Sequence, residues 1–216
     1  MKLDFSKYHL KDKYRKVLEH LSDEDKIKTA IANYSIEELD DICEYYNLRK
    51  HPLLKTLGLE KYGKDPEIAY EYAKNVIKGR WKEAEEVIKT DPEYAYYYAR
   101  DVIQGRFPEA EPFIKTDPDW TYYYARDVIQ GRFPEAEETI KNDPSYACSY
   151  AHYVIKGRWI EAEDIIKTDP KWAYWYAKDV IKGRWIEAEE YIKTNPRIAS
   201  WYAVEVIGDK NFWEDN

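Results

Sequence analysis

The stretch that decides the fold is DPEYAYYYARDVIQGRFPEAEPFIKT, residues 91–116. Its opening pair, Asp91-Pro92, recurs every 26 residues, as Asp-Pro at 65, 117, 143 and 169 and as Asn-Pro at 195. Five full repeats therefore cover 65–194, and residues 195–216 are expected to form a partial, C-terminal capping repeat. We number the positions within each repeat from the first residue of this pair.

Each repeat predicts two short antiparallel helices joined by a turn. Asp91 is a good N-cap, and Pro92 suits the first helical position because its missing N–H would be unpaired there in any case. Gly105 is expected to adopt the left-handed conformation that ends a helix, which places helix A at 92–104. Helix B is expected at 107–115.

The positions of helix A that hardly vary between repeats define its buried side. They are positions 5, 8, 9, 12 and 13, a helical spacing, and in repeat 91–116 they are Ala95, Tyr98, Ala99, Val102 and Ile103. Helix B contributes Ala110 and Ile114. Helices this short cannot bury their apolar sides alone, so each repeat needs its neighbours. The sequence therefore predicts an all-α protein, an α-solenoid or superhelix of 26-residue helix-turn-helix repeats.

Residues 1–64 carry no full copy of the repeat and are expected to form a helical N-terminal capping region. Helices are predicted near 5–20, 23–33 and 35–47, with a shorter one after Pro52. Ser22 and Ser35 are the expected N-caps, and Ser35 forms a capping box with Glu38. Whether a degenerate repeat overlaps the end of this region is left open.

Composition narrows the function. With 34 Lys and Arg against 42 Asp and Glu, the net charge is −8, which disfavours duplex DNA as a partner. No apolar run approaches the ~20 residues of a membrane-spanning helix, and no secretory segment is recognisable, so we expect a cytoplasmic protein that does not enter membranes. Cys43 and Cys148 are far apart and the four histidines lack ligand spacing, so we expect no metal and no cofactor.

Two resemblances follow from the repeated turn. Residues 105–110, GRFPEA, resemble the mid-repeat turn of tetratricopeptide repeats, although those repeats are 34 residues long. The wording YAxxVIxGRWxEAExxI followed by DPxxAYxYA, over 65–207, resembles repeat arrays in uncharacterised proteins of large tailed bacteriophages. The second resemblance implies a viral accessory protein in the host cytoplasm that acts on a host factor, and it supplies no catalytic residues.

Positions 7 and 10 of helix A vary between repeats and are the candidate binding surface. They pair large aromatic residues with basic ones, and the members we select are Tyr97, Arg100, Tyr123, Arg126, His152, Trp175, Lys178 and Trp201. Exposed rings beside cations suit a protein or peptide partner, or alternatively an anionic nucleotide or single-stranded nucleic acid. These rings could also stack on one another between repeats. We call these eight residues the aromatic–basic stripe.

Other patterns favour structure over chemistry. Cys148 and His152 share a helix face four residues apart, which would allow a nucleophile pair, but a non-enzymatic protein is the main expectation. The Arg at position 16, such as Arg80, is expected to form ion pairs with Glu83 or Glu85. The acidic residues at position 11, such as Asp101, could mimic a nucleic-acid backbone but are more simply a solvated surface.

Overall fold

The computed structural model describes residues 5–214, with side chains from residue 12 onward. These residues form α-, π- and 3₁₀-helices joined by turns, and they contain no strand. The predicted all-α class is therefore confirmed. The chain divides into two compact units, residues 1–110 and 111–216.

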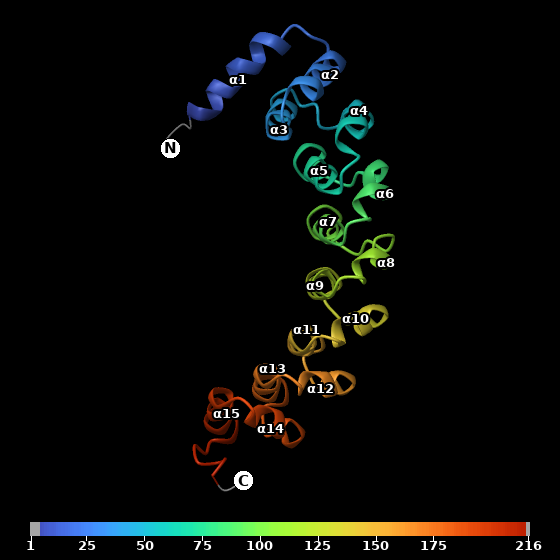
Figure 1. Cartoon of the computed structure of the whole chain (residues 1–216). Helices are drawn as coiled ribbons and strands as arrows, with labels where there is room; N and C mark the ends of the chain where they lie inside the picture. Colours follow the sequence, from blue (N-terminus) through green and yellow to red (C-terminus); the bar gives the residue numbers. More distant parts are fainter. Residues whose placement is uncertain (1–4, 215–216) are drawn as a thin grey trace. The chain divides into compact units, whose positions relative to one another are not determined.

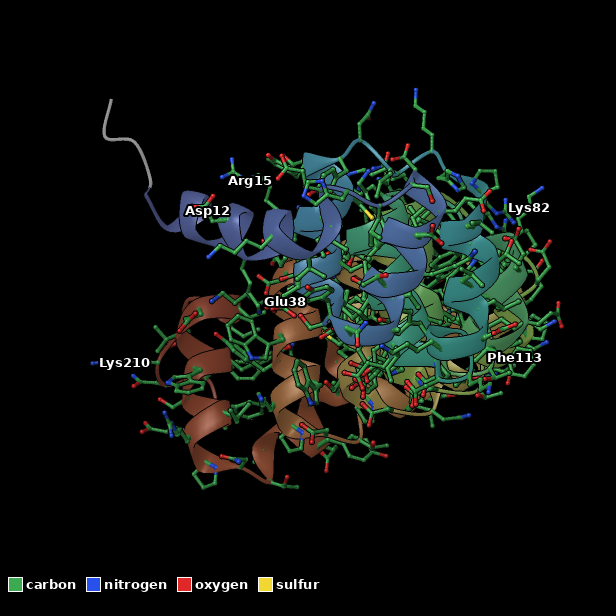
Figure 2. All side chains as sticks on the ribbon, turned by 90° about the horizontal axis from the view of Figure 1, so that it is seen from above. Asp12, Arg15, Glu38, Lys82, Phe113 and Lys210 are labelled. Carbon is green, nitrogen blue, oxygen red and sulfur yellow. The ribbon has the colours of Figure 1, made fainter. Side chains whose placement is uncertain are left out.

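The first unit begins with four α-helices. They are α1 (Phe5–Leu18), α2 (Asp23–Asn33), α3 (Ile36–Tyr45) and α4 (Pro52–Tyr62). Ser22 caps α2, and Ser35 caps α3 in a full capping box with Glu38, as predicted. Figure 2 shows Asp12 and Arg15 beside each other on the outer side of α1, where they form a 3.2 Å ion pair.

The same unit continues with shorter helices from the repeats. They are α5 (Pro66–Tyr72), the π-helix η1 (Ala73–Ile77), the 3₁₀-helix η2 (Lys82–Ala84), α6 (Glu85–Ile88), α7 (Pro92–Tyr97) and the π-helix η3 (Tyr98–Ile103). Helices α5 and α7 lie side by side and contact each other, and α6 packs beside them, against α5 (Figure 1). The first helices of successive repeats thus pack together in this unit.

The second unit repeats this arrangement. Its elements are α8 (Glu111–Ile114), α9 (Pro118–Tyr123), η4 (Tyr124–Ile129), η5 (Pro134–Ala136), α10 (Glu137–Lys141), α11 (Pro144–Tyr150), η6 (Ala151–Ile155), α12 (Ile160–Ile166), α13 (Pro170–Trp175), η7 (Tyr176–Ile181), α14 (Ile186–Lys193), α15 (Pro196–Tyr202) and η8 (Ala203–Ile207). Helices α9, α11, α13 and α15 form one row, and α10, α12 and α14 form the row beside it (Figure 1). Residues that share a position in different repeats therefore line up along a row.

Helix A begins where the sequence predicts. The Asp91 carboxylate accepts hydrogen bonds from the N–H groups of Glu93 and Tyr94, at 2.9 and 3.2 Å. Pro92 follows as the first helical residue, where it has no N–H to leave unpaired. The same N-cap geometry recurs at Asp117, Asp143 and Asp169 in the second unit.

The end of helix A differs from the prediction. The helix widens into a π-helix, and the left-handed residue that closes it is Gln104, with φ of 56°, instead of Gly105. The Ala99 carbonyl accepts the N–H groups of both Gln104 and Gly105, the latter at 3.1 Å. Because this last turn is wide, the residue that closes it precedes the glycine by one place.

Helix B is shorter than predicted in repeat 91–116. The expected helix at 107–115 is reduced to α8, Glu111–Ile114. The second helix α6 of repeat 65–90 is equally short, whereas α14 reaches eight residues. The predicted inward residues Ala110 and Ile114 are fully buried.

The core includes the predicted side of helix A and two further positions. Ala95, Tyr98 and Ala99 are fully buried, whereas Val102 and Ile103 are only half-buried because the π-helix turns them away from the α-helical stripe. The turn aromatic at position 17 and the aromatic at position 6 are also buried, although the sequence did not single them out as core. In the first unit these residues are Trp81, Phe107, Tyr70 and Tyr96.

Candidate recognition surface

The aromatic–basic stripe lies on the first helices of the repeats. Tyr97, Tyr123 and Trp175 are the last residues of α7, α9 and α13, and Trp201 lies in α15. All four rings are half-buried. The basic members follow one turn later in the π-helices, so each cation lies next to a ring of its own repeat.

The rings and the cations of the stripe contact each other directly. The Arg100 guanidinium lies 4.9 Å from the centre of the Tyr97 ring and 5.1 Å from that of Tyr96. Arg126 repeats the arrangement over Tyr123 and Tyr122, at 4.9 and 5.2 Å, and the Lys178 ammonium lies 5.0 Å from Trp175. Cation–π attraction therefore orders the stripe without any partner.

The stripe cations also have carboxylate partners. Arg100 donates to both oxygens of Asp101, at 2.6 and 3.1 Å, and Arg126 forms the same pair with Asp127, at 2.6 and 2.8 Å. Hydrogen bonds from Arg100 hold the pKa of Asp101 well below its usual range. Asp101 and Asp127 at position 11 are thus ion-pair partners of the stripe, which corrects their interpretation as a solvated surface.

Contacts between repeats run through position 6. The Tyr70 hydroxyl donates to Asp101 of the next repeat at 2.7 Å, and Lys74 reaches the same carboxylate at 3.1 Å. The Tyr70 ring lies 5.9 Å from that of Tyr97 in a stacked arrangement. Tyr97 thus contacts the position-6 ring of the preceding repeat, whereas the sequence analysis considered stacking between the stripe rings themselves. The signal for this contact was the Tyr at position 6 of four of the five repeats.

The same contact is present in the second unit. Tyr174 donates to Glu205 of the next repeat at 2.7 Å, and Lys178 donates to this carboxylate at 2.6 Å. The Tyr174 and Trp201 ring centres are 6.1 Å apart. A ring, a cation and the carboxylate of the following repeat are the common parts of this inter-repeat contact.

A second network explains the Arg at position 16. In the first unit, Arg80 donates to both oxygens of Glu85, at 2.6 and 2.9 Å, so its partner is the residue five positions on and not Glu83. Tyr98 of the next repeat donates to Glu85 at 3.1 Å, and its oxygen accepts the Trp81 N–H at 2.7 Å. These arginines hold a structural hydrogen-bond network.

Three copies of this network occur in the second unit. Their members, in the order Arg, Glu, Tyr and turn aromatic, are Arg132, Glu137, Tyr150 and Phe133, then Arg158, Glu163, Tyr176 and Trp159, then Arg184, Glu189, Tyr202 and Trp185. Burial raises the pKa of each of these tyrosine hydroxyls, so they stay protonated donors at neutral pH.

Repeat 143–168 breaks the pattern. Cys148 replaces the position-6 ring, Ser149 the position-7 ring, His152 the basic residue and Tyr153 the acidic one. A pocket of about 460 Å³ opens beside these residues, and Trp172, Trp175 and Asp179 of the next repeat line its other side. Repeat 143–168 therefore lacks the rings that the repeats before and after it carry at positions 6 and 7.

The pocket does not support a cysteine nucleophile. The Cys148 side chain is 5% exposed, and burial together with the charge of Asp179 raises its thiol pKa to about 12. Among the described residues no hydrogen bond joins Cys148 to His152, whose ring instead meets Tyr153 edge-on at 4.4 Å. Catalysis by a cysteine needs the thiolate, which this environment disfavours.

Comparisons with known proteins add no assignment. Searches with protein-family models, against curated proteins and against solved structures found no match to this chain. Within residues 5–214, no group of three or more metal-ligating side chains comes together. None of the helices in that range has the length and apolar character needed to cross a bilayer.

Proposed function

We propose that this chain is a non-enzymatic binding scaffold, an α-solenoid of 26-residue repeats that recognises a protein or peptide through the aromatic–basic stripe. The observation that carries the proposal is the set of half-buried rings at position 7, Tyr97 in the first unit and Tyr123, Trp175 and Trp201 in the second. Aromatic side chains held rigidly at a surface supply large contact areas at low entropic cost, which is typical of protein recognition.

The paired charges favour a protein over a nucleic acid. Arg100, Arg126 and Lys178 each have a carboxylate partner within 2.6 Å. An anionic ligand would have to compete with these carboxylates, and the net charge of −8 would oppose its approach. A peptide can instead add its own rings and hydrogen bonds to the stripe while the internal ion pairs stay in place.

The kind of partner follows from the resemblance to phage repeat arrays. A phage accessory protein acts in the host cytoplasm, so a host protein is the partner to seek. Repeats 91–116, 117–142 and 169–194 each offer one ring at position 7 and one basic group at position 10, and affinity would accumulate over these repeats. Catalytic residues are not required for such a role.

Affinity capture from bacterial lysate tests the proposal. The baits are the unaltered chain, Tyr123→Ala and Trp201→Ala in the stripe, and Ile186→Ala as a control at an exposed residue on the second helix of its repeat. We expect a protein that the unaltered chain and Ile186→Ala retain and that both stripe variants lose by about tenfold. This protein should stay bound after nuclease treatment, and the amount retained should depend only weakly on salt concentration.

Two results would contradict the proposal. Equal retention by the stripe variants would show that the partner binds elsewhere on the chain. Release by nuclease, or a steep loss of binding between low and moderate salt, would favour the nucleic-acid alternative, because such binding releases counterions. Melting curves of the four baits separate a lost contact from a lost fold.

A further inference from the structure

The pocket in repeat 143–168 occupies the place of an inter-repeat contact. Elsewhere in the second unit, the Tyr174 ring fills this place between its own repeat and the next, beside Trp201 and with its hydroxyl on Glu205. In the first unit, Tyr70 fills it beside Tyr97, with its hydroxyl on Asp101. The chain itself therefore shows twice which group complements this space.

The groups that would receive such a ring are all present in repeat 169–194. Trp172 and Trp175 stand at positions 4 and 7, where Tyr94 and Tyr97 contact Tyr70 in the first unit. Asp179 stands at position 11, the place of Asp101. What is missing is the ring itself, because position 6 of the preceding repeat is Cys148.

Asp179 lacks the donors that its equivalents have. Asp101 accepts hydrogen bonds from Tyr70, Lys74 and Arg100, and Glu205 accepts from Tyr174 and Lys178. Within the described part of the chain, Asp179 has neither a hydrogen bond nor an ion pair. A half-buried carboxylate at the wall of a pocket, with no donor of its own, is a ready acceptor for a ligand.

The surroundings select the chemistry of the ligand. The carboxylate of Asp179 disfavours an anion. The two tryptophans already hold cations, since the Lys171 ammonium lies 4.4 Å from Trp172 and the Lys178 ammonium 5.0 Å from Trp175. A second cation would meet like charge there, so a neutral ring that carries a hydrogen-bond donor fits best.

The geometry points to a specific binding site for a phenol-bearing group, a tyrosine side chain of a partner, in the pocket formed by Cys148, Ser149, His152, Trp172, Trp175 and Asp179. The ring packs against the tryptophans, and its hydroxyl donates to Asp179. The volume of about 460 Å³ lies within the range of small-ligand sites. This inference deepens the proposed recognition function, on which the protein nature of the partner rests.

Titration with N-acetyl-tyrosinamide tests the site without any partner. The tryptophan indole N–H signals in two-dimensional NMR report binding, and N-acetyl-phenylalaninamide is the matched probe that lacks the hydroxyl. We expect saturable shifts with the tyrosine probe and binding about tenfold weaker, or weaker still, with the phenylalanine probe, because a hydrogen bond to a charged acceptor is lost. Asp179→Asn should weaken the tyrosine probe to a similar degree.

A filling variant supplies the second test. Cys148→Tyr places the chain's own ring in the pocket, so it should abolish binding of the probe and raise the melting temperature. Ile186→Ala, at an exposed residue outside both the pocket and the stripe, should bind the tyrosine probe like the unaltered chain.

The site is refuted if the unaltered chain shows no saturable shifts, if both probes bind equally, or if Asp179→Asn leaves the tyrosine probe unaffected. Retained binding by a folded Cys148→Tyr chain would also refute it. If this variant fails to fold, the comparison of the two probes and the effect of Asp179→Asn still test whether the site exists. Failure of the lysate capture would not change these outcomes, because the probe needs no partner.

Discussion

At the residue scale, helix A ends at a residue whose side chain makes the left-handed backbone conformation unfavourable. Gln104, Gln130, Lys156 and Lys182 all have φ between 55° and 59°, in the left-handed region that disfavours side chains. The glycine that follows each of them lies outside that region. The Gly therefore marks the turn in the sequence without being its left-handed residue.

Replacing Gln104 by glycine should stabilise the protein. The left-handed conformation costs a residue with a side chain roughly 1–2 kcal/mol, and the greater freedom of glycine in the unfolded chain offsets part of the gain. We expect the free energy of unfolding to rise by about 1 kcal/mol, measured by urea denaturation. Gln104 is exposed, so the substitution removes no buried contact.

Gly105→Ala is the matched control for this prediction. A methyl group at Gly105 would meet no atom within 4 Å, and the backbone there suits any residue. Stability should stay the same or rise slightly, because alanine restricts the unfolded chain. If Gly105→Ala lowers the free energy of unfolding by about 1 kcal/mol and Gln104→Gly does not raise it, the left-handed residue is Gly105 and the prediction is wrong.

At the scale of helices and turns, local signals predicted the starts well and the ends poorly. Asp-Pro specifies an N-cap and a first helical residue within two positions, so the start of helix A was readable from sequence. The π-helix at its end, such as η3, has no comparable local signal. The length of helix B varies from four residues in α6 and α8 to eight in α14, although the 26-residue spacing is the same throughout.

The hydrogen bond between the first helix of one repeat and the turn before it should matter for stability. The fully buried Tyr176 oxygen accepts the Trp159 N–H at 2.7 Å and donates to Glu163 at 3.0 Å. Tyr176→Phe keeps the ring but removes both bonds. Leaving buried polar groups without partners costs about 1–3 kcal/mol each, so we expect a loss of that order in urea denaturation.

Tyr153→Phe serves as the control for Tyr176→Phe. Its side chain is 57% exposed, and water can replace any hydrogen bond of its hydroxyl. The same chemical change should therefore alter stability by less than about 0.5 kcal/mol. Equal effects of the two substitutions would show that the buried network does not stabilise the contact between repeats.

The sequence predicted which residues form the candidate site, but it did not predict the contacts that these residues make between repeats. Variation between repeats identified positions 7 and 10, and both lie at the surface beside one another. The contact of Tyr70 and Lys74 with Asp101 and the pocket beside Cys148 depend on how consecutive repeats meet. The Tyr at position 6 makes that contact. The sequence alone does not distinguish this Tyr from the other tyrosines of helix A, because its partners lie in the next repeat.

At the scale of the whole molecule, each compact unit contains several repeats whose first helices pack on one another. Every repeat shares its Tyr at position 8, and in both units that Tyr completes a network begun in the preceding repeat. This dependence on neighbours is the reason to propose that the array continues as one solenoid. A compact globule of the same length would need contacts between distant repeats, for which the 26-residue pattern carries no signal.

Small-angle X-ray scattering in solution distinguishes these two forms. A compact chain of 216 residues has a radius of gyration of about 17 Å. In the proposed solenoid, first helices stacked at about 9 Å intervals over five repeats and the partial sixth would extend roughly 50 Å before the N-terminal helices are added, so this proposal predicts a radius clearly above the compact value. A radius near the compact value for a monomer would mean that the repeats fold back on themselves, and the proposal of a continuous binding surface would have to be abandoned.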